Sequence, residues 1–279
     1  MYRLTAPLFC VCVLACAPSV SQYQEADATA ADAQPSGPDA RQVVDAGPPA
    51  DAYIPANVEV MMTGDNGYGF GWGTEDAMLN YSGGVESFLA GDIFNCSTGP
   101  ESYTIPGNEA SAGNVLYIIA WADKSTSQGI IGQFKRAGSD QVTYTGTGDW
   151  EVCATGNDFN PSSGGPNLTQ INAALASCNS EIGNLTTTSG GWVGVNGGTN
   201  TSGRLQIGED NTTTRTSVVP GNEFPIACNI DGEAKWMWYA WDDTMIWPTS
   251  GSSFIWPGGS SNVDKQFLIF RLSAEVIIE

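Results

Sequence analysis

The sequence contains no histidine among its 279 residues. This absence excludes serine–histidine and cysteine–histidine catalysis, the common zinc sites and histidine-based pH sensing. The sequence also has no phosphate-binding loop, no Gly-x-Ser-x-Gly nucleophile motif and no dinucleotide-binding fingerprint. Glycoside hydrolysis by paired carboxylates is the one enzyme class that stays open. Asp242 and Asp243 are adjacent, and strand neighbours point to opposite faces, so we predict a turn there and no catalysis.

Basic residues are scarce, with 10 Lys and Arg against 30 Asp and Glu and a formal charge of −20. Six acidic and two basic residues precede residue 58, which leaves 24 acidic and 8 basic residues and a charge of −16 for the rest. Because phosphate contacts need Lys and Arg, we expect no nucleic-acid partner. We interpret the acidic surface as one that keeps an exported protein soluble.

Apolar runs are all too short to cross a bilayer, but residues 1–16 have the form of an export signal. One basic residue, Arg3, precedes a short apolar run that ends in small residues before Cys16. The ending VLAC resembles the lipobox of bacterial lipoproteins. That resemblance implies acylation of Cys16 and an anchor in the outer membrane or at the cell surface, which would be the only contact with a membrane. An ordinary secretory signal, cut nearby, is the alternative.

Large side chains are rare in residues 17–57, which consist mainly of Ala, Asp, Pro and Gly. Such a composition cannot offset the entropy of ordering, so this segment is predicted to be a disordered tether. Residues 58–279 are long enough for one domain with a sizeable core.

Four of the seven cysteines lie after the signal, and none belongs to a C-x-x-C pair. An even number in an exported chain favours disulfides over a metal site. Three pairings are open. We favour Cys153–Cys178, which closes a short loop, together with Cys96–Cys228, which ties an early strand to a late one.

The hydrophobic pattern is that of β-strands separated by turn residues. Besides the strand that carries Tyr68, the predicted strands are 58–64, 115–123, 129–135, 141–146, 150–156, 235–241 and 267–278. One helix is predicted at 167–178, capped by Asn167, with Leu168, Ile171, Ala174 and Leu175 on one face. Apart from that helix, 157–230 is rich in Gly, Thr and Asn and is interpreted as a loop-rich insertion.

Several segments together resemble a known family. TGDNGYGFGWG (63–73), GNVLYIIAWAD, TGTGDWEVCATG and EAKWMW…FLIFR follow the order found in the galactose-binding-domain-like jelly roll of carbohydrate-binding modules. The resemblance covers roughly 58–156 and 233–273. It implies an all-β jelly-roll sandwich that binds sugar without catalysis, and similar sandwiches often hold a structural calcium ion. The chain departs from the family in 157–230 and in FGWG, so we assign no ligand-binding loop to it from the resemblance.

The stretch 63–73 allows two interpretations. Asp65-Asn66-Gly67 is predicted to form a tight turn between antiparallel strands. Tyr68, Phe70 and Trp72 then share one face of the next strand, with glycines on the other. That aromatic face is either core or, through Tyr68 and Trp72, a surface on which sugars stack.

Nine tryptophans are the other informative feature. Alternation places Trp236 and Trp238 on one face of a strand and Trp241 on the other, and we expect one of these faces to be core. Trp121 and Trp150 also lie within predicted strands and are expected to be structural. Trp247 and Trp256, each followed by proline, lie in predicted loops as sugar platforms or as plugs over the end of the sandwich.

The sequence thus favours a lipid-anchored, surface-displayed β-sandwich that binds carbohydrate or another extracellular ligand without catalysis. Trp247, Trp256, Trp72 and Tyr68 are its candidate ligand residues, and no metal site is assigned. A structural or adhesive protein that binds another protein is the alternative, followed by a glycoside hydrolase.

Overall fold

The computed structural model describes residues 55–87, 92–93, 99–111, 113, 115–121, 128–158, 164–180, 189–198, 201–212, 226–240 and 266–273. All of them belong to one compact unit, Ala52–Glu279. Several predictions fall outside the described residues: the signal with Cys16, almost all of the tether, Cys96, the Asp242–Asp243 pair, Trp241, Trp247 and Trp256.

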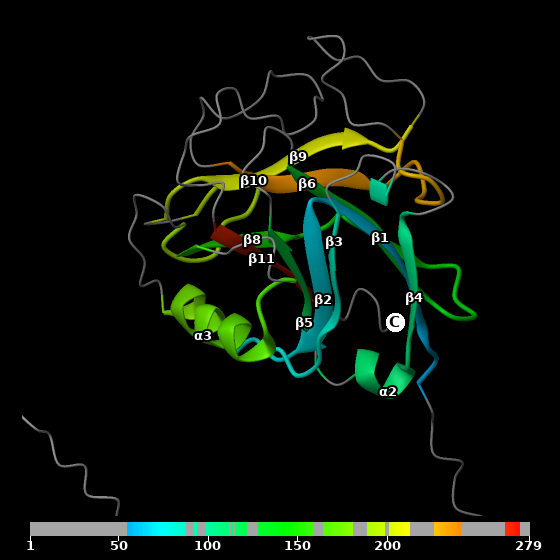
Figure 1. Ribbon diagram of the computed structural model, residues 1–279, viewed down its shortest axis with the longest axis horizontal. Coiled ribbons are helices and arrows are strands. Elements are labelled where there is room, and N and C mark those ends of the chain that lie inside the picture. Colours follow the sequence, from blue (N-terminus) through cyan, green and yellow to red (C-terminus); the bar gives the residue numbers. More distant parts are fainter. Residues whose placement is uncertain are drawn as a thin grey trace, which may run out of the picture. The chain divides into compact units, whose positions relative to one another are not determined.

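Two antiparallel sheets form a β-sandwich, which confirms the predicted fold class (Figure 1). One sheet has the order β4-β1-β6-β10-β9, with β7 paired to β6, and the other has the order β3-β2-β5-β11-β8. The six-stranded sheet comprises β1 (Val58–Asp65), β4 (Glu101–Ile105), β6 (Gly129–Arg136), β7 (Val142–Tyr144), β9 (Arg204–Asp210) and β10 (Lys235–Ala240). The five-stranded sheet comprises β2 (Gly67–Gly73), β3 (Ser82–Glu86), β5 (Val115–Trp121), β8 (Glu151–Asp158) and β11 (Gln266–Ser273). The described helices are α2 (Gly107–Ala110) and α3 (Leu168–Asn179).

Aromatic side chains of β2 fill the space between the sheets. Tyr68, Phe70 and Trp72 are buried in the main hydrophobic cluster, together with residues from both sheets. The ring of Phe134, in β6, lies edge-on to Phe70 at 5.9 Å and to Trp72 at 6.4 Å between centroids. The alternation in β2 was therefore predicted correctly, and the core interpretation agrees with the burial of all three rings.

The predicted hairpin turn at Asp65-Asn66-Gly67 is wrong. Asp65 ends β1 opposite Gly129 in the six-stranded sheet, whereas Gly67 begins β2 opposite Trp121 in the five-stranded sheet. Residues 65–67 therefore form a corner at which the chain crosses from one sheet to the other. The side chains of Asp65 and Asn66 are 8% and 5% exposed, because this corner is packed against its neighbours.

Glycines of β2 allow the chain to approach itself closely, as glycines in strands often do. A Cβ atom at Gly69 would lie 2.5 Å from the ring of Tyr81, and one at Gly71 would collide with the backbone carbonyl of Asn80. The face of β2 opposite the aromatic residues is thus covered by residues 77–81 of the same chain.

Strand β9 was not predicted, and it lies inside the segment 157–230 that was interpreted as loop-rich. Its sequence, RLQIGED, buries only Leu205 among its apolar residues, because β9 is the edge strand beside β10. Next to it, β10 is buried on both faces, with Trp236 and Met237 both inaccessible. Tyr239 donates a hydrogen bond to the carbonyl of Ser202 at 3.0 Å, so the chain just before β9 covers part of β10.

Helix α3 follows the prediction within one residue at each end. Asn167 accepts from the backbone of Gln170, whose side chain in turn accepts from the backbone of Asn167, which completes a capping box. Ile171 and Leu175 pack in a second cluster with residues of β5, β8 and β11, so α3 covers part of the outer face of the five-stranded sheet (Figure 1).

A disulfide between Cys153 in β8 and Cys178 in α3 ties the helix to this sheet, as predicted. Both cysteines are buried, and such a bond indicates an oxidising compartment outside the cytoplasm. Cys228 is also disulfide-bonded, and Cys96, its predicted partner, lies outside the described residues.

Candidate functional site

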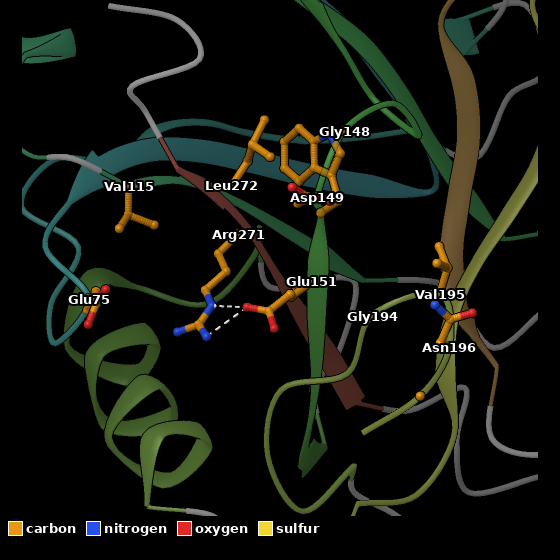
Figure 2. A pocket seen from close by; sticks show the side chains of 12 residues that line it. Glu75, Val115, Gly148, Asp149, Glu151, Gly194, Val195, Asn196, Arg271 and Leu272 are labelled. Atoms are coloured by element: carbon orange, nitrogen blue, oxygen red, sulfur yellow. Dashed lines mark hydrogen bonds and ion pairs between the residues drawn. The ribbon is translucent and has the colours of Figure 1, made fainter. Parts of the chain in front are cut away.

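A polar cleft of about 510 Å³ opens on the outer face of the five-stranded sheet, beside α3 (Figure 2). Its polar side chains are Glu75, Asp149, Glu151, Asn196 and Arg271. Glu75 comes from the loop after β2, and Asp149 from the bend just before β8. Glu151 begins β8, Arg271 belongs to β11, and Asn196 lies in a turn at residues 194–197. Gly148, Gly194 and Gly197 complete much of the wall and leave backbone groups exposed there.

An ion pair between Arg271 and Glu151 lies at the centre of the cleft. Phe270 and Leu272 face the core, so Arg271 between them faces outward, directly opposite Glu151 in the β11–β8 register. The Nε and Nη2 atoms of Arg271 each lie 2.7 Å from one carboxylate oxygen, Oε2, of Glu151. The two side chains are 23% and 40% exposed, so water screens the pair only in part.

Trp192 supports this ion pair. The guanidinium carbon of Arg271 lies 4.0 Å from the centroid of the Trp192 ring, which is a cation–π contact. The indole nitrogen of Trp192 donates to Asn179 Oδ1, at the end of α3, at 2.8 Å. The tryptophan therefore fixes the plane of the guanidinium relative to the helix.

Glu75 lies on the other side of Arg271 from Glu151 (Figure 2). Tyr117, in β5, lies opposite Arg271 in the register with β11, and its hydroxyl donates to the carbonyl of Thr74 at 2.5 Å. Burial raises the pKa of Tyr117 to about 12, while the charge of Arg271 acts to lower it and that of Glu75 to raise it. Tyr117 is thus a protonated hydrogen-bond donor at neutral pH, close to the positive charge of Arg271 and the negative charge of Glu75.

The turn at 194–197 forms the opposite rim. Val193 and Val152 exchange two backbone hydrogen bonds of 2.9 Å, which attach this segment to β8. The carbonyl of Gly194 accepts from Gly197 at 3.0 Å and from Leu205 of β9 at 2.9 Å. The segment therefore joins the edges of both sheets and holds Asn196 in an exposed position above the cleft.

The sequence-predicted ligand residues do not meet in this cleft. Tyr68 and Trp72 are buried between the sheets, while Trp247 and Trp256 lie outside the described residues. Burial also raises the pKa of Tyr68, whose hydroxyl bonds to Glu101 and Tyr103 within the sandwich. Trp150, expected to be structural, is buried at the edge of the cleft, and its indole nitrogen donates to the carbonyl of Tyr144 at 3.0 Å.

Sequence reasoning missed every polar residue of the cleft. One signal was present: Arg271 is a lone charge inside the apolar run FLIFRLS, and such a charge needs a partner. Glu75 lies in the loop after β2, whereas Trp192 and Asn196 lie in the segment 192–197, and the local sequence contains no motif that would connect the two.

In the described part of the chain, no group of three or more Asp, Glu, Cys or His residues is arranged to hold a metal ion. The segment NIDGE forms a turn, as predicted, in which the backbone of Glu233 donates to Asp231 Oδ1 at 2.9 Å. Among the described helices, none is long and apolar enough to span a bilayer.

Comparison of the chain with protein-family models, with curated proteins and with solved structures found no match. The geometry of the cleft is therefore the basis for assigning a function.

Proposed function

We propose that this protein is an exported, non-catalytic binding protein that holds a carbohydrate in the cleft beside α3. The observation that carries this proposal is the lining of the cleft, a space of about 510 Å³: eight of its twelve lining residues are glycines or have polar side chains, and the apolar four are Val115, Trp150, Val195 and Leu272. Ligand sites for apolar molecules have mainly apolar walls, whereas this wall presents closely spaced donors and acceptors. A polyhydroxylated ligand matches such a wall, because each hydroxyl group both donates and accepts.

The sequence resemblance supports the same proposal. The β-sandwich agrees with a jelly-roll-like domain, and membership in the galactose-binding-domain-like group is part of what we propose. Trp247 and Trp256 remain the proposed stacking residues, and they would extend the binding surface beyond the described part of the chain. A structural calcium ion remains compatible with this family.

Binding assays with cleft variants test the proposal. We expect the protein to bind at least one neutral glycan of an array, and the double replacement Asn196→Ala and Asp149→Ala to weaken that binding about 10-fold or more, as expected for lost hydrogen bonds. Both residues are exposed, so the melting temperature should not change. The matched control is Asn157→Ala, which changes an exposed asparagine at the opposite end of β8.

The outcomes separate the candidate functions. An affinity that falls only with Trp247→Ala or Trp256→Ala would place the ligand in the tryptophan loops and not in the cleft. No binding to any glycan, together with capture of a protein ligand, would favour the adhesive alternative. Turnover of chromogenic glycosides would instead favour a hydrolase.

A lipid anchor at Cys16 is the second part of the proposal. Replacing Cys16 with serine is expected to abolish acylation, because the thiol is the atom to which the lipid is attached. Labelling with palmitate should mark the wild-type protein in the membrane fraction and leave Cys16→Ser unlabelled. A variant that still carries the label would refute the anchor, and protease treatment of whole cells would report which face displays the domain.

A further inference from the structure

The charge of Arg271 is already compensated within the cleft. Two of its three guanidinium nitrogens bond to one oxygen of Glu151, and its face rests on Trp192. The third nitrogen, Nη1, and the other carboxylate oxygen, Oε1, take part in no hydrogen bond within the described part of the protein. The pair therefore carries no net charge and leaves one donor and one acceptor at its two opposite ends, because Nη1 points away from Glu151, toward the side of Glu75 (Figure 2).

The remaining charges in the cleft are negative. Among the described lining residues, Arg271 is the only base, whereas Glu75 and Asp149 add two carboxylates for which the described residues provide no ion pair. The lining thus has a formal charge of −2. Glu75 and Asp149 are exposed, so water screens this repulsion in part, and a ligand carboxylate or sulfate meets it when it binds close to them.

We infer that the cleft selects uncharged sugars and rejects uronic acids and sulfated sugars. This inference rests on the carbohydrate-binding function proposed above. Arg271 Nη1 donates to the oxygen of one sugar hydroxyl, and a hydroxyl at the other end of the ion pair donates to Glu151 Oε1. Because Glu151 already compensates the guanidinium, Arg271 is not available as the counter-charge that recognition of an acidic sugar requires.

Calorimetry with sugar pairs that differ only at C6 tests this selectivity. Methyl glucoside and methyl galactoside, or their oligomers, are compared with the matching glucuronide and galacturonide. For the wild type we expect at least about 10-fold tighter binding of the neutral member, which corresponds to one unfavourable charge contact. Added salt should strengthen binding of the uronate and leave that of the neutral sugar unchanged, because salt screens repulsion.

Two variants link the selectivity to the cleft. Glu151→Gln removes one negative charge and leaves Arg271 uncompensated, so the preference for the neutral sugar should shrink or reverse. Glu75→Gln removes a negative charge from the side of the cleft opposite Glu151, and it should reduce the preference for the neutral sugar by a smaller factor. Glu75 is exposed, so this variant decides the question even if Glu151→Gln fails to fold.

The results distinguish the two proposals. If the wild type binds uronates at least as tightly as neutral sugars, the selectivity is refuted while carbohydrate binding stands. If neither variant changes the ratio, the cleft charges are refuted as its cause. If no member of any pair binds, both proposals are refuted.

Discussion

Replacing Trp72 with alanine is expected to lower the free energy of unfolding by about 3–5 kcal/mol, the usual cost of truncating a large core aromatic. Trp72 is fully buried between the sheets. Its ring lies edge-on to Phe70 at 6.0 Å and to Phe134 at 6.4 Å between centroids. Alanine would leave a cavity that the rigid strands on both sides cannot close. Urea denaturation monitored by circular dichroism measures the change.

Leu79→Ala is the matched control, because Leu79 is 52% exposed and lies alongside the same strand, where its backbone donates to the carbonyl of Trp72 at 2.9 Å. Its effect should stay within about 0.5 kcal/mol, as is usual at the surface. The sequence also allowed Trp72 to be a ligand residue. A Trp72→Ala protein with wild-type stability and weakened sugar binding would show that the ring contacts ligand and would contradict the core assignment.

Removing the disulfide with Cys153→Ala and Cys178→Ala is expected to cost about 3 kcal/mol, the value typical of a loop of this size. The two cysteines are 25 residues apart, and the bond holds α3 against β8. Without it, the unfolded chain gains conformational freedom, and the cluster beneath the helix depends on packing alone. Guanidinium unfolding of the double variant, compared with the wild type under non-reducing conditions, measures the loss.

The control for effects of the alanines themselves compares the wild type and the double variant under reducing conditions, where the bond of Cys228 is also open in both, and their midpoints should then be close. Equal midpoints for the oxidised wild type and the double variant would contradict a stabilising role. Peptide mapping without reductant should recover Cys153 linked to Cys178, and a different pairing would overturn the assignment.

Local patterns predicted those parts of the fold that depend on neighbouring residues. Tyr68, Phe70 and Trp72 alternate with glycine, so one face of β2 had to be aromatic, and it is buried. Asn167 was predicted to cap the helix, and α3 begins there, with Gln170 completing a capping box. The pairing of Cys153 with Cys178 followed from the short loop that it closes.

The features that the sequence failed to predict depend on contacts between segments far apart in the chain. Asp65-Asn66-Gly67 has the chemistry of a hairpin turn, but the same residues suit a crossing between sheets, and the choice depends on β5 and β6. Strand β9 contributes little to the core, so its sequence contains no strong periodic signal. The cleft unites residues from five separate segments, and of these only Arg271 was conspicuous in its own segment.

The corner at residues 65–67 has a consequence for how the sandwich opens. It joins β1 of one sheet directly to β2 of the other, and the partner strands reach the same point, with Gly129 of β6 opposite Asp65 and Trp121 of β5 opposite Gly67. Ladder hydrogen bonds thus hold both sides of the corner, one side in each sheet. Separating the sheets at this point therefore strains both ladders at once. The amide protons of β1, β2, β5 and β6 should therefore exchange with solvent together, through one global opening, more slowly than those of the edge strands.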